Sequence, residues 1–78
     1  MSTFVQLQDL IALTLKVPAA KITPSLRNED LSAWDSLAHV NLMMALEQTF
    51  DIYIEAEEFA SLTSVPAILE FLKARNVV

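Results

Sequence analysis

Apolar residues recur with helical periodicity along most of the chain, and groups of turn-forming residues separate the periodic stretches. Residues 3–17 predict a first helix that ends before Pro18, because proline disfavours helical geometry in the residue that precedes it. Residues 55–60 predict a short third helix, and residues 64–75 predict a fourth with Ser64 as its amino-terminal cap. The first helix has an apolar stripe at the spacing of one helix face, namely Phe4, Leu7, Ile11 and Leu15.

The predicted second helix, residues 36–50, differs from an ordinary surface helix because it has two apolar faces. Asp35 is a suitable amino-terminal cap, and its negative charge favours the positive end of the helix dipole. The first face, which we expect to join the core, consists of His39, Leu42, Met43, Leu46 and Phe50. The second consists of Leu37, Val40 and Met44, interspersed with Asn41, Glu47 and Gln48. It is either a second core contact or an exposed interaction surface, and its polar residues favour exposure.

A long connection, residues 18–35, lies between the first two predicted helices. A loop of this length in a compact domain needs apolar contacts to hold it, and suitable side chains recur through it. These are Ile22, Leu26, Leu31 and Trp34. Residues 50–54 alternate in a strand-like way, but an isolated strand has no partner in a helical chain, so we expect a connection. The prediction is an all-α fold, a small four-helix bundle forming one domain over residues 1–78.

Composition narrows the class of protein further. The chain has 78 residues, 54 % of them apolar and only 8 % aromatic, and it has no cysteine, so an aliphatic core must supply its stability. The absence of cysteine fits a reducing compartment, and no apolar run approaches the ~20 residues of a membrane span. The first twenty residues do not resemble a signal peptide. We therefore expect a cytoplasmic protein with no membrane association.

Charge is distributed unevenly along the chain. The net charge is −5, and no Lys or Arg occurs between Asn28 and Leu72. Nucleic-acid binding requires a basic patch, so nucleic acid is excluded as a partner class. A basic protein surface is a plausible partner, because complementary charge steers encounter. The alternative is an acidic surface that serves only solubility.

Ser36, at the start of the second helix, has three interpretations. It is a structural helix-start serine, a catalytic nucleophile, or an attachment site for another group. Catalysis would use His39, three residues later on the same face, but a nucleophile elbow needs glycines that this chain lacks. A lone histidine on a core face is more often a hydrogen-bonded packing residue than a base, and we expect no catalytic residue and no metal ligand. A phosphodiester on Ser36 would lie at the positive end of the helix dipole, which favours attachment.

The motif Asp35-Ser36-Leu37, followed by "AHVNLMMALEQTF" and later by "LTSVPAILEFL", resembles the acyl carrier protein family over essentially the whole chain. The resemblance implies that Ser36, with Asp35 and Leu37 beside it, receives 4′-phosphopantetheine from coenzyme A. A separate Mg²⁺-dependent phosphopantetheinyl transferase would add it, and an acyl group would then travel as a thioester between enzymes with basic docking surfaces. The implied partner contacts are Leu37, Val40, Asn41, Met44, Glu47, Gln48, Ile54 and Glu57.

The sequence also departs from the pattern of carriers in fatty acid synthesis. Neutral Asn41 stands where those carriers often have an acid, and His39 is unlike them. These departures favour a carrier dedicated to one biosynthetic pathway. We also expect the chain to be a monomer. Two alternatives stay open at this point: an aminoacyl or peptidyl carrier of the peptide synthetase type, and a helical interaction module that associates through Leu37, Val40 and Met44.

Overall fold

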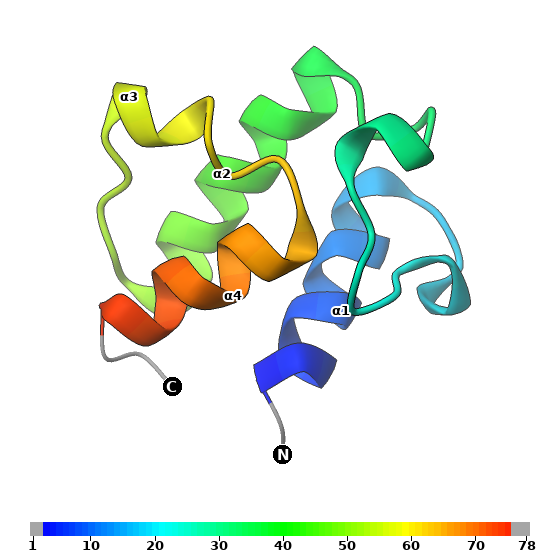
Figure 1. Cartoon of the computed structure of the whole chain (residues 1–78), viewed down its shortest axis with the longest axis horizontal. Coiled ribbons are helices and arrows are strands. Elements are labelled where there is room, and N and C mark those ends of the chain that lie inside the picture. The colour runs from blue at the N-terminus through cyan, green and yellow to red at the C-terminus, as the bar shows by residue number, and fades with distance from the viewer. Residues whose placement is uncertain (1–2, 76–78) are drawn as a thin grey trace.

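Four α-helices and two short 3₁₀ turns make up the regular structure of residues 3–75, the part of the chain that this computed structural model describes (Figure 1). The elements in order are α1 (Thr3–Leu15), η1 (Ala19–Lys21), η2 (Asn28–Asp30), α2 (Ser36–Phe50), α3 (Ala56–Phe59) and α4 (Val65–Ala74). The predicted all-α bundle, with a long first connection and a short third helix, is confirmed. The strand-like stretch after α2 is an irregular connection, as expected.

Two helices end in left-handed residues although the chain has no glycine. Lys16 follows α1 at φ 60°, and Asp51 follows α2 at φ 53°. In each case the next amide turns back toward the helix: Val17 N–H donates to the Ala12 carbonyl at 3.0 Å, and Ile52 N–H to the Glu47 carbonyl at 3.1 Å. This Schellman geometry satisfies carbonyls that the helix end leaves unpaired. It also ends α1 at Leu15, two residues before the predicted Val17.

The core is aliphatic and draws on every long helix. α1 buries Leu7 and Ile11 completely, which confirms the predicted stripe, while Phe4 and Leu10 pack at its edge. From α2 the buried side chains are Leu42, Met43 and Leu46, and from α4 they are Val65, Ile68 and Leu72. The first of the two predicted faces of α2 is therefore the core face, and the second is left for the surface.

The long connection is held against this core by apolar side chains, as predicted. Ile22, Leu26 and Trp34 are buried within it, and Leu31 is half-buried. Backbone hydrogen bonds tie it to the segment before α4, since Asn28 N–H donates to the Thr63 carbonyl and Val65 N–H to the Leu26 carbonyl. These bonds fix the approach of the chain to α2.

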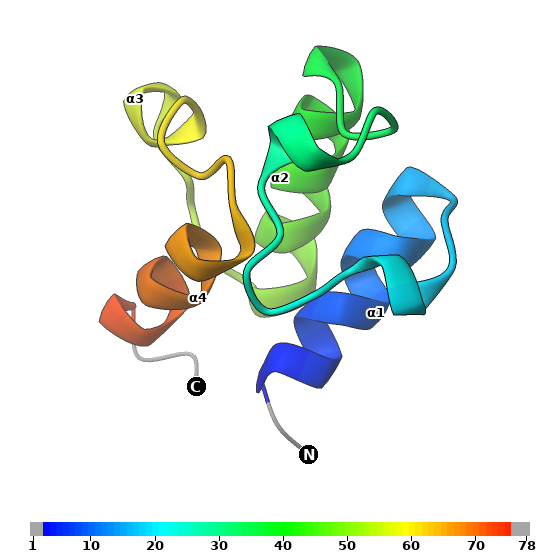
Figure 2. The ribbon, with the colours of Figure 1, turned by 45° about the vertical axis from the view of Figure 1, so that its right-hand side comes forward.

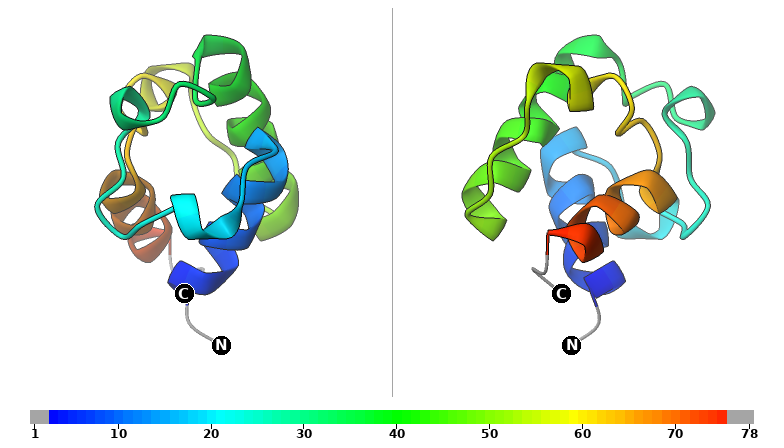
Figure 3. Two further views of the ribbon diagram at one scale, coloured as in Figure 1. Left: turned by 90° about the vertical axis from the view of Figure 1, so that its right-hand side faces the viewer. Right: turned by 60° about the vertical axis from the view of Figure 1, so that its left-hand side comes forward.

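The first residues of α1 and α2 lie at opposite ends of the molecule (Figures 2 and 3). α2 begins at one end of the molecule, and α1 begins at the opposite end, in every view (Figures 2 and 3). α3 lies beside the amino-terminal half of α2 (Figure 1). Within residues 3–75, no helix has the length and apolarity needed to cross a bilayer.

Candidate attachment site and partner surface

Ser36 is the first residue of α2 and is exposed. Asp35 is the amino-terminal cap, as predicted, and its Oδ1 accepts the Ala38 N–H at 2.9 Å. The cap holds the carboxylate against the helix backbone, and the serine that follows it begins the first turn. The hydroxyl of Ser36 is therefore presented at the surface, where a separate enzyme can reach it.

The local electrostatics suit a phosphate ester at this position. The first amides of a helix have no intrahelical acceptor, and Asp35 takes only that of Ala38. The amides of Ser36 and Leu37 thus remain available at the positive end of the helix dipole, which stabilises a nearby anion. The residues present fit a covalently attached phosphopantetheine, because an exposed serine begins the helix.

His39 makes hydrogen bonds within the fold and does not act as a base for Ser36. The indole N–H of Trp34 donates to His39 Nδ1 at 3.0 Å, so His39 Nε2 carries the proton and donates to the Phe59 carbonyl at 2.7 Å. Both ring nitrogens are used, and the ring links the loop before Ser36, α2 and α3. This confirms the prediction of a hydrogen-bonded packing histidine. The sequence indicated Trp34 as a loop anchor but did not show its pairing with His39, because no local motif encodes it.

The second apolar face of α2 is a surface. Leu37 is 72 % exposed, Val40 43 % and Met44 49 %, and the intervening Asn41 and Gln48 are also exposed. Leu37, Val40 and Met44 are spaced three and four residues apart, as are Asn41, Met44 and Gln48, so the five residues lie along one face of the helix, which we call the α2 outer face. It starts at the residue after Ser36. The exposed alternative of the sequence analysis is thus the correct one.

Two residues that were expected to contact partners, Ile54 and Glu47, are less exposed than a partner contact requires. Ile54 is only 3 % exposed, so the expectation that its side chain contacts partners is wrong for this conformation. The reason is that the segment after α2 folds inward, and its apolar side chain joins the core. Glu47 is half-buried, and its Oε2 accepts the Ile54 N–H at 2.8 Å. Its carboxylate therefore holds this segment to α2 as well as bordering the surface.

Charged residues near α3 are partly neutralised within the molecule. Arg75, just after α4, donates through Nη2 to Glu58 Oε1 at 3.0 Å and through Nη1 to the Tyr53 carbonyl. Its guanidinium also lies 4.5 Å from the centre of the Phe71 ring. Glu57, the remaining expected contact, is exposed on α3. Among the described residues, no group of acids or histidines has the arrangement of a metal site.

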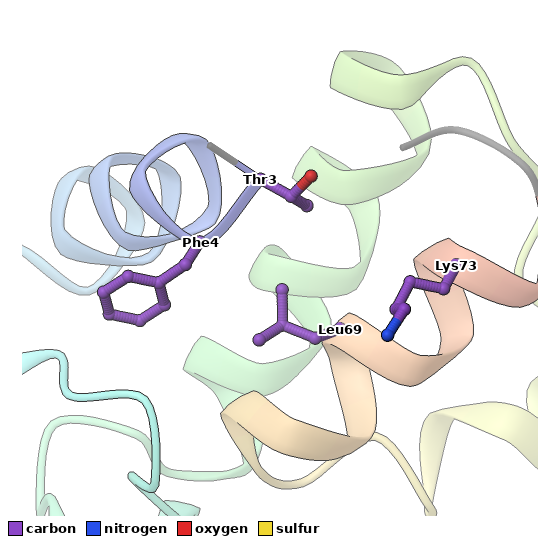
Figure 4. A pocket seen from close by; sticks show the side chains of 4 residues that line it. All are labelled: Thr3, Phe4, Leu69 and Lys73. Carbon is purple, nitrogen blue, oxygen red and sulfur yellow. The ribbon is translucent and has the colours of Figure 1, made fainter. Parts of the chain in front are cut away.

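A shallow pocket between α1 and α4 is separate from the Ser36 site. Thr3, Phe4, Leu69 and Lys73 line it (Figure 4). It includes the first turn of α1, at the opposite end of the molecule from the start of α2 (Figure 2). It is thus too remote to be part of a site around Ser36.

Comparison with known proteins agrees with this geometry. Residues 5–72 match the family model described as the phosphopantetheine attachment site. The chain is 45 % identical over 69 residues to the acyl carrier protein of Buchnera aphidicola subsp. Baizongia pistaciae, with 87 % of each chain covered. It is 38 % identical over 74 residues to that of Helicobacter pylori, covering 94 % of each. It is 40 % identical over 72 residues to that of Syntrophobacter fumaroxidans, covering 92 % of this chain and 88 % of the relative.

Proposed function

Since this chain belongs to the acyl carrier proteins, which bear covalent 4′-phosphopantetheine and are carriers rather than enzymes, we propose that Ser36 is its attachment residue. The observation that supports this most directly is the exposed Ser36 hydroxyl at the start of α2, directly after a capping aspartate. Asp35 and Leu37 complete the motif. We further propose that residues 1–78 form one carrier domain.

The modification is a phosphoryl transfer in which this chain supplies only the acceptor. Ser36 Oγ forms a bond to the phosphorus that bears pantetheine in coenzyme A, and the bond from that phosphorus to the leaving adenosine 3′,5′-bisphosphate breaks. The hydroxyl proton passes to the phosphopantetheinyl transferase or its solvent, because both nitrogens of the neighbouring His39 are engaged elsewhere. The helix start stabilises the resulting phosphodiester.

When bound, the group supplies a terminal thiol on which an acyl chain is held as a thioester. This chain contributes recognition and raises the effective concentration of the acyl group, while partner enzymes perform the chemistry. We propose as partner contacts Leu37, Val40, Asn41, Met44, Gln48 and Glu57, with Glu47 at the border of the surface. We propose a monomer of the cytoplasm, serving a dedicated biosynthetic pathway.

The test is mass spectrometry of the purified apo chain after incubation with coenzyme A, Mg²⁺ and a broad-specificity phosphopantetheinyl transferase. We expect one phosphopantetheine to be added to the wild type and none to Ser36→Ala. Ser32→Ala is the matched control, because Ser32 is an exposed serine of the loop before α2, and it should be modified like the wild type. An unmodified wild type, or a modified Ser36→Ala, would contradict the assignment.

The thioester present on the chain in its native host identifies the pathway. We expect a small acyl group from a dedicated pathway, because α2 has neutral Asn41 and His39 where carriers of fatty acid synthesis have other residues. An aminoacyl thioester would instead support a carrier of the peptide synthetase type. Mass spectrometry of the intact holo protein from that host distinguishes the two.

A further inference from the structure

His39 is the one histidine of the chain, and it joins the segment before Ser36 to α3. The indole N–H of Trp34 donates to His39 Nδ1 at 3.0 Å, and His39 Nε2 lies 2.7 Å from the Phe59 carbonyl oxygen. An indole N–H can only donate and a carbonyl can only accept, so these two bonds require a neutral ring with its proton on Nε2. The arrangement therefore depends on the charge of His39 as well as on its position.

A second proton on the His39 ring affects its two hydrogen bonds in opposite ways. A proton on Nδ1 turns the acceptor of the Trp34 bond into a donor, so that two N–H groups face each other and the bond is lost. The bond from Nε2 to the Phe59 carbonyl keeps its donor and becomes charge-assisted, which strengthens it. Protonation thus removes the contact with the segment before Ser36 and keeps the contact with α3.

The contact that protonation removes holds the segment that leads into α2. Trp34 directly precedes the capping Asp35 and lies two residues before Ser36. Its side chain is only 2 % exposed, and a buried donor that loses its acceptor costs free energy until the side chain moves to meet water. His39 is half-buried, so its ring lies within reach of solvent protons. We therefore expect a protonated His39 to shift the indole outward and to loosen the residues before Ser36.

The other titratable groups on the segments that His39 joins are acids. They are Asp35 before α2, Glu47 in α2, and Glu55, Glu57 and Glu58 at α3. Asp35 caps α2, and Glu58 is paired with Arg75, the cation that contacts α3. None of these acids forms a hydrogen bond or an ion pair with His39, and carboxylates ordinarily take up protons at lower pH than histidine does. The response to protonation therefore comes from the two bonds of the ring.

From this geometry we propose that His39 is a proton-sensitive positioning residue. In its neutral form it fastens Trp34, and with it the segment before Ser36, to α2. In its protonated form it releases Trp34 while it stays bound to α3. The change takes place between about pH 8 and about pH 5, the range in which histidine ordinarily changes its charge. It is a property of the unmodified chain, so it is testable without any group on Ser36.

NMR of the nitrogen-labelled apo chain tests the two bonds separately, because one histidine and one tryptophan give unambiguous signals. At about pH 8 the His39 ring should carry its proton on Nε2 alone, and at about pH 5 on both nitrogens. Across this range the protection of the Trp34 indole N–H from exchange, relative to a free indole at the same pH, should fall at least about fivefold. Trp34 fluorescence should shift to longer wavelength with the same midpoint, and the Nε2–H of His39 should stay protected.

Two substitutions that do not titrate each keep one of the two bonds. His39→Asn places an amide oxygen near the position of Nδ1, so it accepts from Trp34 at every pH. Its indole N–H protection should change by less than about twofold over the same pH range. His39→Gln places an amide nitrogen near the position of Nε2, so it keeps a donor for the Phe59 carbonyl but offers Trp34 no acceptor at Nδ1. Its indole N–H should be as weakly protected at about pH 8 as that of the wild type at about pH 5.

Three results would overturn the proposal. The first is indole N–H protection that stays constant while the wild-type ring takes up its second proton, and this result needs no variant. The second is loss of protection at the His39 Nε2–H before the indole N–H, because α3 would then be the element released. The third is an equal pH-dependent loss of indole protection in His39→Asn, which would assign the effect to another titrating group.

Discussion

Glu47 borders the α2 outer face and also makes a hydrogen bond within the fold. Substituting it tests whether its side chain stabilises the structure, contacts partner enzymes, or does both. Its Oε2 accepts the Ile54 N–H at 2.8 Å, seven residues along the chain, and so holds the segment after α2 against the helix. Glu47→Ala removes the acceptor and leaves a part-buried amide without its partner. Glu47→Gln keeps a carbonyl oxygen at nearly the same place and removes only the charge.

The expected loss of stability follows from how far the hydrogen bond between Glu47 and the Ile54 N–H is buried. Hydrogen bonds to charged groups contribute about 1.5–3 kcal/mol, and the part-buried setting places this one near the lower end of that range. We expect Glu47→Ala to lower the free energy of unfolding by about 1–2 kcal/mol, which for a domain of this size corresponds to roughly 4–16 °C in Tm. Glu47→Gln should cost less than about 1 kcal/mol. Gln48→Ala, the exposed neighbour, should cost less than about 0.5 kcal/mol.

Urea denaturation followed by circular dichroism measures these differences, and transferase kinetics measure the second role. Because one carboxylate oxygen faces inward, we expect Glu47→Gln to retain kcat/KM within about twofold of the wild type. Glu47→Ala with wild-type stability would show that the bond to Ile54 N–H contributes nothing. Glu47→Gln with wild-type stability but a tenfold loss of kcat/KM would show that the charge contacts the partner.

Three other substitutions test separate parts of the fold. Met44→Glu should change the free energy of unfolding by less than about 1 kcal/mol in urea melts, because Met44 is half exposed; a loss of several kcal/mol would place it in the core. Lys16→Gly should stabilise by about 0.5–1 kcal/mol, because glycine adopts positive φ without strain, whereas Lys21→Gly should not; equal effects would refute this reason. Trp34→Phe should destabilise by at least about 1 kcal/mol because it removes the donor to His39 Nδ1, and unchanged thermal melting would argue against that bond.

The local features of this chain were readable from the sequence. Helix positions follow from apolar spacing, and the caps Asp35 and Ser64 follow from residue types that compete for the first amides of a helix. The two faces of α2 were also visible, since a helix places its side chains by sequence spacing alone. Ser36 was singled out by the same local reasoning and by the motif around it.

The contacts between distant residues were decided only by the tertiary structure. Periodicity gave two apolar faces on α2 and indicated which one joins the core, but it left open whether the second was buried as well; the packing of the whole core left Leu37, Val40 and Met44 at the surface. Ile54 was placed on the partner surface and lies in the core, because an irregular segment has no period from which burial can be read. The hydrogen bond from Trp34 to His39 was likewise not readable from the sequence. Such pairings depend on where the chain brings separate elements together, and spacing along one element carries no information about that.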